Sequence, residues 1–474
     1  MFGSALLGVT AIGVGLVRQH LEKKSPPLKL CGSPVRSFMS SIQDRSRQFL
    51  WHPCTQMKQL EATSPLAIAR GEGPWLIDVD GKRYLDAISS WWVNLFGHCN
   101  PRINAAITDQ LGKIEHVMLA GATHAPVVEL SERLANLTGL GHAFYGSDGS
   151  SATEIALKMS AHYWRNVGQA EKNAFISLKN AYHGETVGAL SVTDIPLFKL
   201  TYEPLLRHSV QVPTPDARLA EAGESAEAFA LRCADALEAH LTEHADTTAA
   251  FIIEPLVQGA AGMGMYHPVY LRRARELCDR YGVHLIADEI AVGFGRTGTM
   301  FACEQADIRP DFICLSKGIT GGYLPLSAVL TTDDIYGAFY GDATAKGFLH
   351  SHSYTGNPLA CRAALAVLDI FESDQVIAAN RDKSSDFTKA LSEVSAHSRA
   401  RNFRQRGMIW AFEVADATPD FSARFHEEAL AQGMFIRPIG HTVYVMPPYV
   451  VEVEDMALLA RAMRACLDQM PAVE

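Results

Sequence analysis

The feature that most constrains the fold is an alternation of short apolar runs with helical stretches that begins near residue 142. The apolar runs are His142–Tyr145, Ala174–Leu178, Ala249–Ile253, Val283–Ala287 and Phe312–Leu315. The stretch Leu271–Tyr281, between the third and fourth runs, has a helical pattern. Strand–helix–strand order is typical of a parallel sheet covered by helices. The sequence therefore predicts an α/β fold whose ligands bind beyond the carboxyl ends of the strands.

The C-terminal part has a different pattern, which predicts a smaller α+β domain. Phe435–Pro438 and Val443–Met446 flank a short Gly440–His441 connection, as in a hairpin. Met456, Leu459, Met463 and Leu467 recur at helical spacing.

Two further segments are predicted to be helical. Asn357–Pro358 is typical of an N-cap followed by proline at the first helical position, and predicts a helix to about Phe371. The Ala- and Glu-rich run Leu219–Ala245 is interpreted as a pair of solvated helices without chemistry.

Charge and cysteine content exclude several classes of function. Lys and Arg number 42 against 52 acidic residues, a net charge of −10, so nucleic acid and anionic membranes are not expected partners. The nine cysteines contain no pair at the spacing of a zinc or thioredoxin motif. We expect reduced thiols, no metal and a cytoplasmic protein that acts on small molecules.

The first residues form an apolar stretch that precedes the globular part. Met1–Val17 has no charged side chain, but with four glycines it is at the short limit of a membrane-spanning helix. We interpret residues 1–38 as a non-globular extension, and a membrane anchor is the alternative. Ser41 and Asp44 then have the spacing of a capping box that begins a helix.

Three strand ends carry side chains suited to one cofactor. After Tyr145, the small residues Gly146–Ser151 precede a helix whose Ser151 and Glu154 have capping-box spacing, which favours a phosphate site; an ordinary tight loop is the alternative. The run Val283–Ile290 delivers Asp288, and a cation is expected to meet this carboxylate. Lys317 follows the next run. Pyridoxal phosphate needs an anion site, a partner for its ring nitrogen and an amine, so the combination predicts that cofactor.

These residues resemble the signature of class III aminotransferases, which have pyridoxal-phosphate fold type I. Asp288–Ile290 is followed by Gly293–Gly298, and Lys317 lies 29 residues after Asp288. The resemblance extends from about Trp51 to the end of the chain.

The resemblance implies a domain organisation and a cofactor site. It implies an N-terminal part of a small domain at 39–95, a large cofactor-binding domain at 96–356 and a C-terminal part of the small domain at 357–474. The implied cofactor-binding residues are Gly149, Ser150, Tyr182, Asp288, Ile290, Lys317, His352 and Ser353. Lys317, Asp288 and Tyr182 are implied to be catalytic: Lys317 joins the cofactor covalently, Asp288 keeps its ring nitrogen protonated and Tyr182 stacks on the ring.

The resemblance also implies the substrate site and a partner. The implied substrate-binding residues are Cys54, Trp91, Trp92, Tyr182, Lys317, Ser351, Arg437 and Tyr444. Arg437 is implied to bind a carboxylate. Ser351–Ser353 resembles a loop that reaches the cofactor phosphate of the other subunit, which implies a homodimer with shared active sites.

Two positions depart from the pattern. Cys54 stands where a tyrosine is typical, so one polar contact to substrate is missing or replaced. Ser351–Ser353 stands where the nearest relatives have Gly-Pro-Thr, although His-Ser is similar to other class III members.

Other hypotheses predict different chemistry. Gly293–Gly298 fits the G-x-G-x-x-G pattern of a nicotinamide-dependent dehydrogenase, but its acidic residues precede the glycines. His350 and His352 suggest a metal pair without a third ligand. A different ω-amino substrate and a non-catalytic scaffold are the remaining alternatives.

Overall fold

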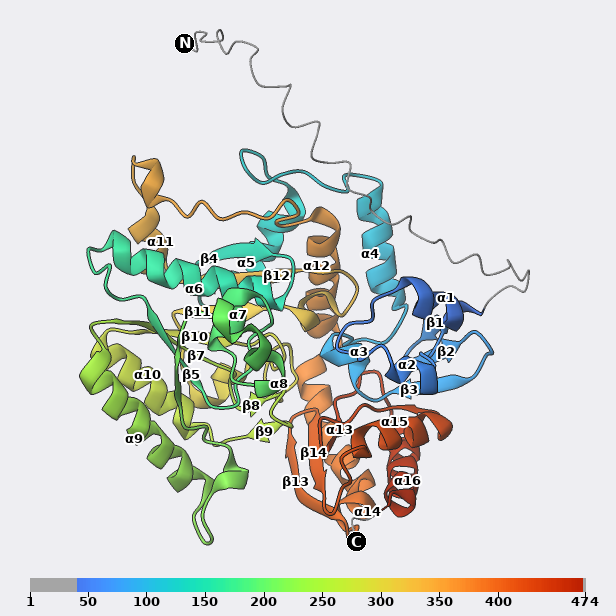
Figure 1. The fold of residues 1–474 in the computed structure, drawn as a ribbon. Coiled ribbons are helices and arrows are strands. Elements are labelled where there is room, and N and C mark those ends of the chain that lie inside the picture. Colours follow the sequence, from blue (N-terminus) through green and yellow to red (C-terminus); the bar gives the residue numbers. More distant parts are fainter. Residues whose placement is uncertain (1–40, 472–474) are drawn as a thin grey trace, which may run out of the picture. The chain divides into compact units, whose positions relative to one another are not determined.

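The protein is described by a computed structural model that covers residues 41–471 (Figure 1). Its contacts divide the chain into two units, Met1–Ala67 and Ile68–Glu474. The predicted extension at residues 1–38 lies outside the described residues. Within residues 41–471, no helix is both long and apolar enough to cross a bilayer.

The described part of the first unit consists of two short helices, α1 (Ile42–Phe49) and α2 (Gln59–Ala62). The predicted capping box is confirmed, because the Ser41 hydroxyl accepts from the Asp44 amide and the Asp44 carboxylate accepts from the Ser41 amide. Arg47 donates to the Leu60 carbonyl at 3.0 Å and so joins the two helices.

A seven-stranded, mostly parallel sheet forms the centre of the second unit. In spatial order its strands are β4 (His142–Gly146), β12 (Ser327–Thr331), β11 (Phe312–Leu315), β10 (His284–Asp288), β7 (Thr248–Ile253), β5 (Ala174–Leu178) and β6 (Val210–Val212). Only β12 runs antiparallel to its neighbours. The predicted α/β class and all five predicted strands are confirmed.

Helices cover both faces of this sheet, which explains why its strands are continuous apolar runs. On one face α6 (Gly149–Asn166) packs against alternate residues such as Ile252 and Ile286. On the other, α9 (Ala226–His244) and α10 (Val269–Tyr281) lie alongside each other and cover Phe251 and Leu285 (Figure 1).

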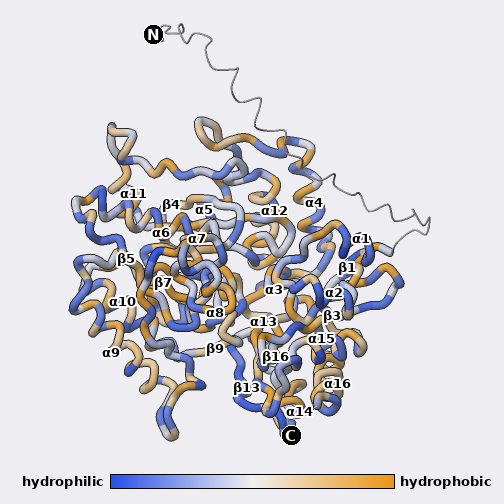
Figure 2. The backbone as a smooth tube through the Cα atoms, viewed as in Figure 1, coloured by the Kyte–Doolittle hydropathy of each residue, from blue (hydrophilic) through white to orange (hydrophobic). Residues whose placement is uncertain are grey.

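The helix α9 corrects one prediction. The run Leu219–Ala245 contains one long helix, Ala226–His244, rather than a solvated pair. One face is buried, with Phe229, Cys233, Leu237 and Leu241 four residues apart. Figure 2 shows hydrophobic and hydrophilic residues alternating along it. Composition concealed this apolar stripe because Ala and Glu outnumber its larger members.

Two smaller sheets combine residues from distant parts of the chain. The first has the order β1 (Ile68–Glu72), β2 (Trp75–Asp78), β3 (Arg83–Asp86) and β15 (Met434–Phe435). The second has the order β13 (Ala400–Arg406), β14 (Ile409–Val414) and β16 (Thr442–Val445). The predicted C-terminal hairpin is therefore wrong. Its two segments enter different sheets, where β3 and β14 satisfy their backbone groups.

The remaining elements connect or cover these sheets. The helix α12 (Pro358–Ser373) begins at the predicted N-cap Asn357, and α16 (Val453–Gln469) has the predicted periodicity, so both predictions are confirmed. The other α-helices are α3 (Ser89–Trp92), α4 (Pro101–Leu111), α5 (Ala125–Thr138), α7 (Val187–Val192), α8 (Pro196–Lys199), α11 (Asp333–Phe339), α13 (Val376–Ala390), α14 (Ser392–Ser395) and α15 (Phe421–Ala431). Short 3-10 turns are η1 (Leu200–Leu205), η2 (Ala217–Leu219), η3 (Ala302–Ala306), η4 (Lys317–Thr320) and η5 (Thr344–Lys346), and β8 (Val257–Gln258) pairs with β9 (Gly264–Met265).

Candidate active site

Three neighbouring parallel strands end at one edge of the large sheet, and each delivers an ionisable side chain. Asp288 is the last residue of β10, Glu254 follows β7, and Lys317 comes two residues after β11. Asp288 is paired with Cys314 of β11, so the aspartate and the lysine belong to adjacent strand ends. A direct contact between Lys317 and Asp288 stays a prediction, because the side chain that is bonded to Asp288 is His183.

Lys317 lies at a strained backbone position beside the ring of Trp92. Its backbone φ of 47° is in the left-handed region, and its Nζ is 4.4 Å from the ring centroid of Trp92. Burial lowers the pKa of the Lys317 amine to about 8, although Asp288 and Glu254 oppose this effect. About a tenth of the amine is therefore neutral at pH 7, and only the neutral amine is a nucleophile or a base.

Asp288 is buried and oriented by two hydrogen bonds. His183 Nδ1 donates to Oδ2 at 2.7 Å, and the Ile290 amide donates to Oδ1 at 3.1 Å. The His183 Nε2 atom is buried and has no hydrogen-bond partner in the described structure. The strand ends at Asp288, earlier than the predicted Val283–Ile290. Sequence reasoning gave His183 no role, although it adjoins Tyr182.

Glu254 is a buried carboxyl group that sequence reasoning missed. It accepts from the amides of Tyr182 and Gly259, both at 3.0 Å. Burial raises the pKa of the Glu254 carboxyl group to about 7, although nearby His183 lowers it. The strand-end rule that identified Asp288 applies equally to Glu254, because Glu254 directly follows the predicted run Ala249–Ile253.

Tyr182 lies in the loop after β5. Its hydroxyl donates to Glu185 at 2.9 Å, and its ring centroid is 5.6 Å from that of Phe198. Stacking of Tyr182 on a cofactor stays a prediction.

The start of α6 corrects the predicted cap. Asp148, not Ser151, is the N-cap, and it accepts from the Ser151 amide at 2.8 Å. Glu154 instead accepts from the Gly188 amide at 2.7 Å. The first amides of a helix have no intrahelical acceptor, so those of Gly149 and Ser150 are left for an anion.

Ile290 and Gly149 are close neighbours at this helix start. A Cβ at Gly149 would lie 3.0 Å from Ile290 Cγ2, so a larger residue would crowd the space beside the helix amides. The Ser150 hydroxyl accepts from the Glu185 amide at 3.2 Å, which links the helix start to the Tyr182 loop.

Two adjacent tryptophans in α3 face two different cations. Trp92 lies against Lys317, and its indole Nε1 donates to the Tyr444 hydroxyl at 3.0 Å. Trp91 is half-exposed, and the Arg437 guanidinium is 5.8 Å from its ring centroid. The structure thus gathers Trp92, Tyr444 and Lys317 in one cluster, with Trp91 and Arg437 beside it.

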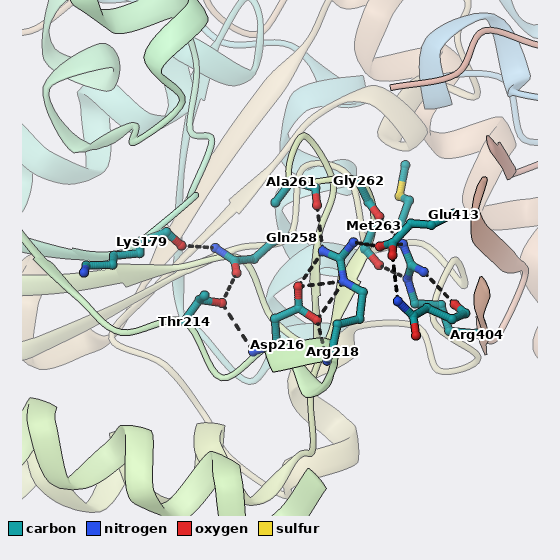
Figure 3. Close-up of polar contacts among 11 residues, drawn as sticks. Lys179, Thr214, Asp216, Arg218, Gln258, Ala261, Gly262, Met263, Arg404 and Glu413 are labelled. Carbon is teal, nitrogen blue, oxygen red and sulfur yellow. Dashed lines mark hydrogen bonds and ion pairs between the residues drawn. The ribbon is translucent and has the colours of Figure 1, made fainter. Parts of the chain in front are cut away.

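The hairpin of β8 and β9 packs closely against the ring of Trp92. A Cβ at Gly259 would lie 2.8 Å from the Trp92 ring, so the backbone approaches the indole closely. Figure 3 shows the polar contacts that fix this hairpin, including Gln258 to the Lys179 carbonyl at 3.0 Å, Arg218 to the Ala261 carbonyl at 2.8 Å and Arg404 to the Met263 carbonyl at 2.9 Å. Arg218 also pairs with Asp216 and Glu413.

The predicted loop residues Ser351, His352 and Ser353 have no described contact with this cluster. In the loop before α12, the Thr355 hydroxyl accepts from the His352 amide and donates to the His352 carbonyl. The Nε2 atoms of His350 and His352 are 3.0 Å apart, and His350 Nδ1 is 2.7 Å from Lys158 Nζ of α6. Ser351 and Ser353 are exposed. Cys54 belongs to the Met1–Ala67 unit, where its thiol is exposed.

The motif Gly293–Gly298 does not form a dinucleotide site. No helix begins at its last glycine, and the next element is the short turn η3. Its Arg296 is instead buried and donates to the carbonyls of Asn94 and Pro447. Among the described residues no group of three His, Cys, Asp or Glu side chains is arranged to hold a metal.

The residues at the sheet edge fit pyridoxal phosphate. Free amides at the start of α6 suit the phosphate, the buried Asp288 with its His183 support suits a protonated ring nitrogen, and Lys317 supplies an amine of lowered pKa. The space that a Gly149 side chain would fill lies beside Ile290.

Fold and site together define a pyridoxal-phosphate-dependent transferase, and comparison with known proteins agrees. The family model "Aminotransferase class-III" matches residues 57–467. The chain therefore belongs to the class III aminotransferases, enzymes that use pyridoxal 5'-phosphate.

Similar proteins share a more specific name. The adenosylmethionine-8-amino-7-oxononanoate aminotransferase of Helicobacter pylori is 43% identical over 92% of this chain and 99% of its own. The enzyme of the same name from Geobacter sulfurreducens is 42% identical, over 88% and 95%.

Solved structures give the same fold. That of the enzyme of the same name from Methanocaldococcus jannaschii has a TM-score of 0.85 at 36% identity, over 90% of this chain and 98% of that chain. The omega transaminase from Pseudomonas jessenii in complex with PMP has a TM-score of 0.86 at 30% identity, over 90% and 98%.

Proposed function

We propose that this aminotransferase moves an amino group from S-adenosylmethionine to 8-amino-7-oxononanoate and so makes 7,8-diaminononanoate, a step of biotin synthesis. The names of the similar enzymes support this reaction. The resemblance to that enzyme rests on the segments Trp51–Pro53, Ser89–Trp92, Thr123–Pro126, Tyr182–Gly184, Ile436–Pro438 and Tyr444–Pro448.

The observation that carries the proposal is the pair of cations over adjacent tryptophans. Lys317 faces Trp92 and Arg437 faces Trp91, so a substrate along the two rings would have its reacting end and its carboxylate each beside a cation. A long-chain keto acid such as 8-amino-7-oxononanoate has these two ends. The planar guanidinium offers two parallel hydrogen bonds to a carboxylate.

Each group of site residues has a separate role in the reaction. When bound, pyridoxal phosphate supplies an electron sink. Neutral Lys317 Nζ would take a proton from the amine-bearing carbon of the donor and pass it to the cofactor, and would reverse this transfer at the keto carbon of the acceptor. Asp288, held by His183, favours the protonated ring nitrogen by its negative charge. Tyr182 and Ile290 would hold the ring, and Gly149 and Ser150 would hold the phosphate.

The remaining proposed contacts belong to the substrates and the partner subunit. Cys54, Trp91, Trp92, Tyr444 and Ser351 line the substrate site. His352 and Ser353 reach the phosphate of the other subunit in a homodimer with shared active sites. Mixing two inactive variants, Lys317→Ala and a loop variant such as Ser353→Asp, tests this: mixed dimers regain activity only if each site uses both chains.

The domain boundaries and the location of the protein are also proposals. Parallel pairing of Leu85 with Met434 supports a small domain built from 39–95 and 357–474. Buried free thiols such as those of Cys278 and Cys314 support a cytoplasmic enzyme. Cell fractionation tests this location.

Product formation tests the proposed reaction. Purified holoenzyme with both proposed substrates should form 7,8-diaminononanoate, detected by mass spectrometry. Absence of this product from an enzyme that converts another amine with pyruvate would overturn the proposal.

A second candidate is an ω-amine transaminase with a different donor. Two observations favour it: the close fit to the omega transaminase from Pseudomonas jessenii and the thiol of Cys54 in place of a typical tyrosine. Single-turnover reactions separate the two candidates. Faster reaction with S-adenosylmethionine than with a simple amine supports the first, and the reverse order supports the second.

A further inference from the structure

The turn that carries the two tryptophans has an unusual backbone. Ser89, Ser90, Trp91 and Trp92 have φ values of 52°, 46°, 73° and 72°, so four consecutive residues with side chains adopt the left-handed region. This conformation is unfavourable for each L residue because Cβ crowds the following carbonyl. Such a turn persists only where its surroundings hold it.

A buried carboxylate holds the first half of the turn. Asp86, which is fully buried at the end of β3, accepts from the Ser90 amide at 2.8 Å and from the Ser90 hydroxyl at 2.7 Å. His98 Nε2 lies 3.1 Å from the second of these oxygens. The Asn94 amide group donates to His98 Nδ1 at 3.1 Å, which leaves the proton on Nε2 facing Asp86.

A buried guanidinium holds the other end. Arg296 donates to the carbonyls of Asn94 at 3.0 Å and Trp92 at 3.4 Å. It also donates to Pro447 at 2.7 Å, next to the Met446 carbonyl that accepts from Ser89 Oγ. The turn therefore has an anion at its amide end and a cation at its carbonyl end, the charge order that its peptide dipoles favour.

The conformation of the turn determines where the two rings stand. Trp92 lies against Lys317 and bonds Tyr444, while the next-door Trp91 faces Arg437. We propose that Asp86 is a positioning residue for the substrate site: by holding Ser90 in the left-handed turn, it sets Trp91 and Trp92 between Lys317 and Arg437. Asp86 itself does not touch the substrate. The kinetic part of the test rests on the proposed function.

A neighbouring strand offers a matched control. Asp78, at the end of β2, is also buried, and it accepts from the Tyr84 hydroxyl at 2.9 Å and the Lys82 amide at 2.8 Å. It has no hydrogen bond to the Ser89–Trp92 turn among the described contacts. Asp78→Asn and Asp86→Asn therefore remove similar charges from the same small sheet, but only Asp86→Asn weakens the turn.

The first experiment measures the turn without using activity. Amide hydrogen exchange of the two holoenzymes is followed in peptides that cover 87–98. Asp86→Asn should speed exchange there by about tenfold, because charge-assisted hydrogen bonds hold the Ser90 amide. Asp78→Asn should leave these peptides unchanged. Unchanged exchange in Asp86→Asn would overturn the proposal.

The second experiment measures KM and kcat for 8-amino-7-oxononanoate. If only about a tenth of the Asp86→Asn molecules hold the turn, KM rises about tenfold while kcat changes less. A purely structural role would give Asp78→Asn the same KM as Asp86→Asn, and this result would overturn the proposal.

A milder variant keeps the test decisive if Asp86→Asn does not fold. Ser90→Ala removes one hydrogen bond to Asp86 and should raise KM about threefold, with faster exchange in the same peptides. An unchanged KM and unchanged exchange in Ser90→Ala would contradict the proposal. If the wild-type enzyme does not use this acceptor, the proposed function fails and exchange alone decides the role of Asp86.

Discussion

The carboxyl edge of the large sheet and the Ser89–Trp92 turn place active-site residues in opposite ways. At the sheet edge, the register of β7, β10 and β11 places Glu254, Asp288 and Lys317 at neighbouring strand ends, where contacts such as His183 to Asp288 then orient them. The turn depends on Asp86 and Arg296 and on the Met446 carbonyl, which is 357 residues from its partner Ser89. The comparison suggests that the fold itself fixes the reaction chemistry, whereas long-range contacts fix the shape of the substrate site.

The strongest test of the sheet edge is Lys317→Ala. We expect activity to fall by about 10⁴-fold or more, because the variant loses the nucleophile and the proton-transferring base together. Cofactor should still bind through its phosphate, and the fold should persist. Steady-state rates and a visible spectrum measure these effects. Near wild-type transamination by Lys317→Ala would contradict the assignment.

Asp288→Asn tests the second residue of the same edge. The substitution keeps the shape but removes the charge that holds the ring nitrogen protonated, so both half-reactions should slow by about 10²- to 10³-fold. Single-turnover rates with each substrate measure the loss. Unchanged rates would mean that this strand-end carboxylate has no electronic role.

Arg437→Ala tests the side of the turn that faces the substrate carboxylate. A charge-assisted hydrogen bond contributes about 1.5 to 3 kcal/mol, so KM for the acceptor should rise about ten- to a hundredfold. The KM of Arg437→Lys should lie between those of the wild type and Arg437→Ala, because an ammonium group lacks the planar arrangement of donors of a guanidinium. If Arg437 binds mainly the long-chain acceptor, the rate of the donor half-reaction should fall less. Equal losses for donor and acceptor would indicate a shared carboxylate site, and no loss for either would make Arg437 a surface ion pair.

The pH dependence of cofactor uptake tests the amine itself. The pKa of Lys317 is lowered by burial from its usual 10.5 to about 8, so its neutral fraction grows about tenfold per pH unit below pH 8 and then levels off. The rate at which apoenzyme takes up pyridoxal phosphate should follow this curve, measured by absorbance. A rate that still climbs tenfold per unit above pH 9 would place the pKa near its usual value.

The same shift has a consequence for stability. Between pH 8 and 10.5 the unfolded chain keeps the Lys317 proton that the folded protein has lost, so this residue makes the free energy of unfolding rise with pH in that window. Below pH 8 both states bind the proton, and the destabilising effect of burying the charge is present in full.

The smallest effect is expected from removing residues 1–38. Because the apolar stretch is interrupted by glycines and precedes a linker, cofactor content and activity should change by less than about twofold. Fractionation of the full-length protein is the control. Recovery mainly in membranes, with the shortened protein soluble, would establish an anchor.

The sequence by itself determined the sheet and the chemistry at its edge. Buried parallel strands are local apolar runs, and strand ends meet at one edge whatever the loops do, so Asp288, Lys317 and the Asn357 cap could be found from nearby residues alone. Glu254 obeys the same rule, because it directly follows β7.

Tertiary structure decided what depends on distant partners. The two segments of the predicted C-terminal hairpin enter different sheets because β3 and β14 pair with them. Asp148 replaces Ser151 as the N-cap because α6 begins three residues earlier than predicted. The left-handed turn could not be read from Ser89–Trp92, since those residues disfavour it locally. It exists because Asp86 and Arg296 stabilise it across the chain.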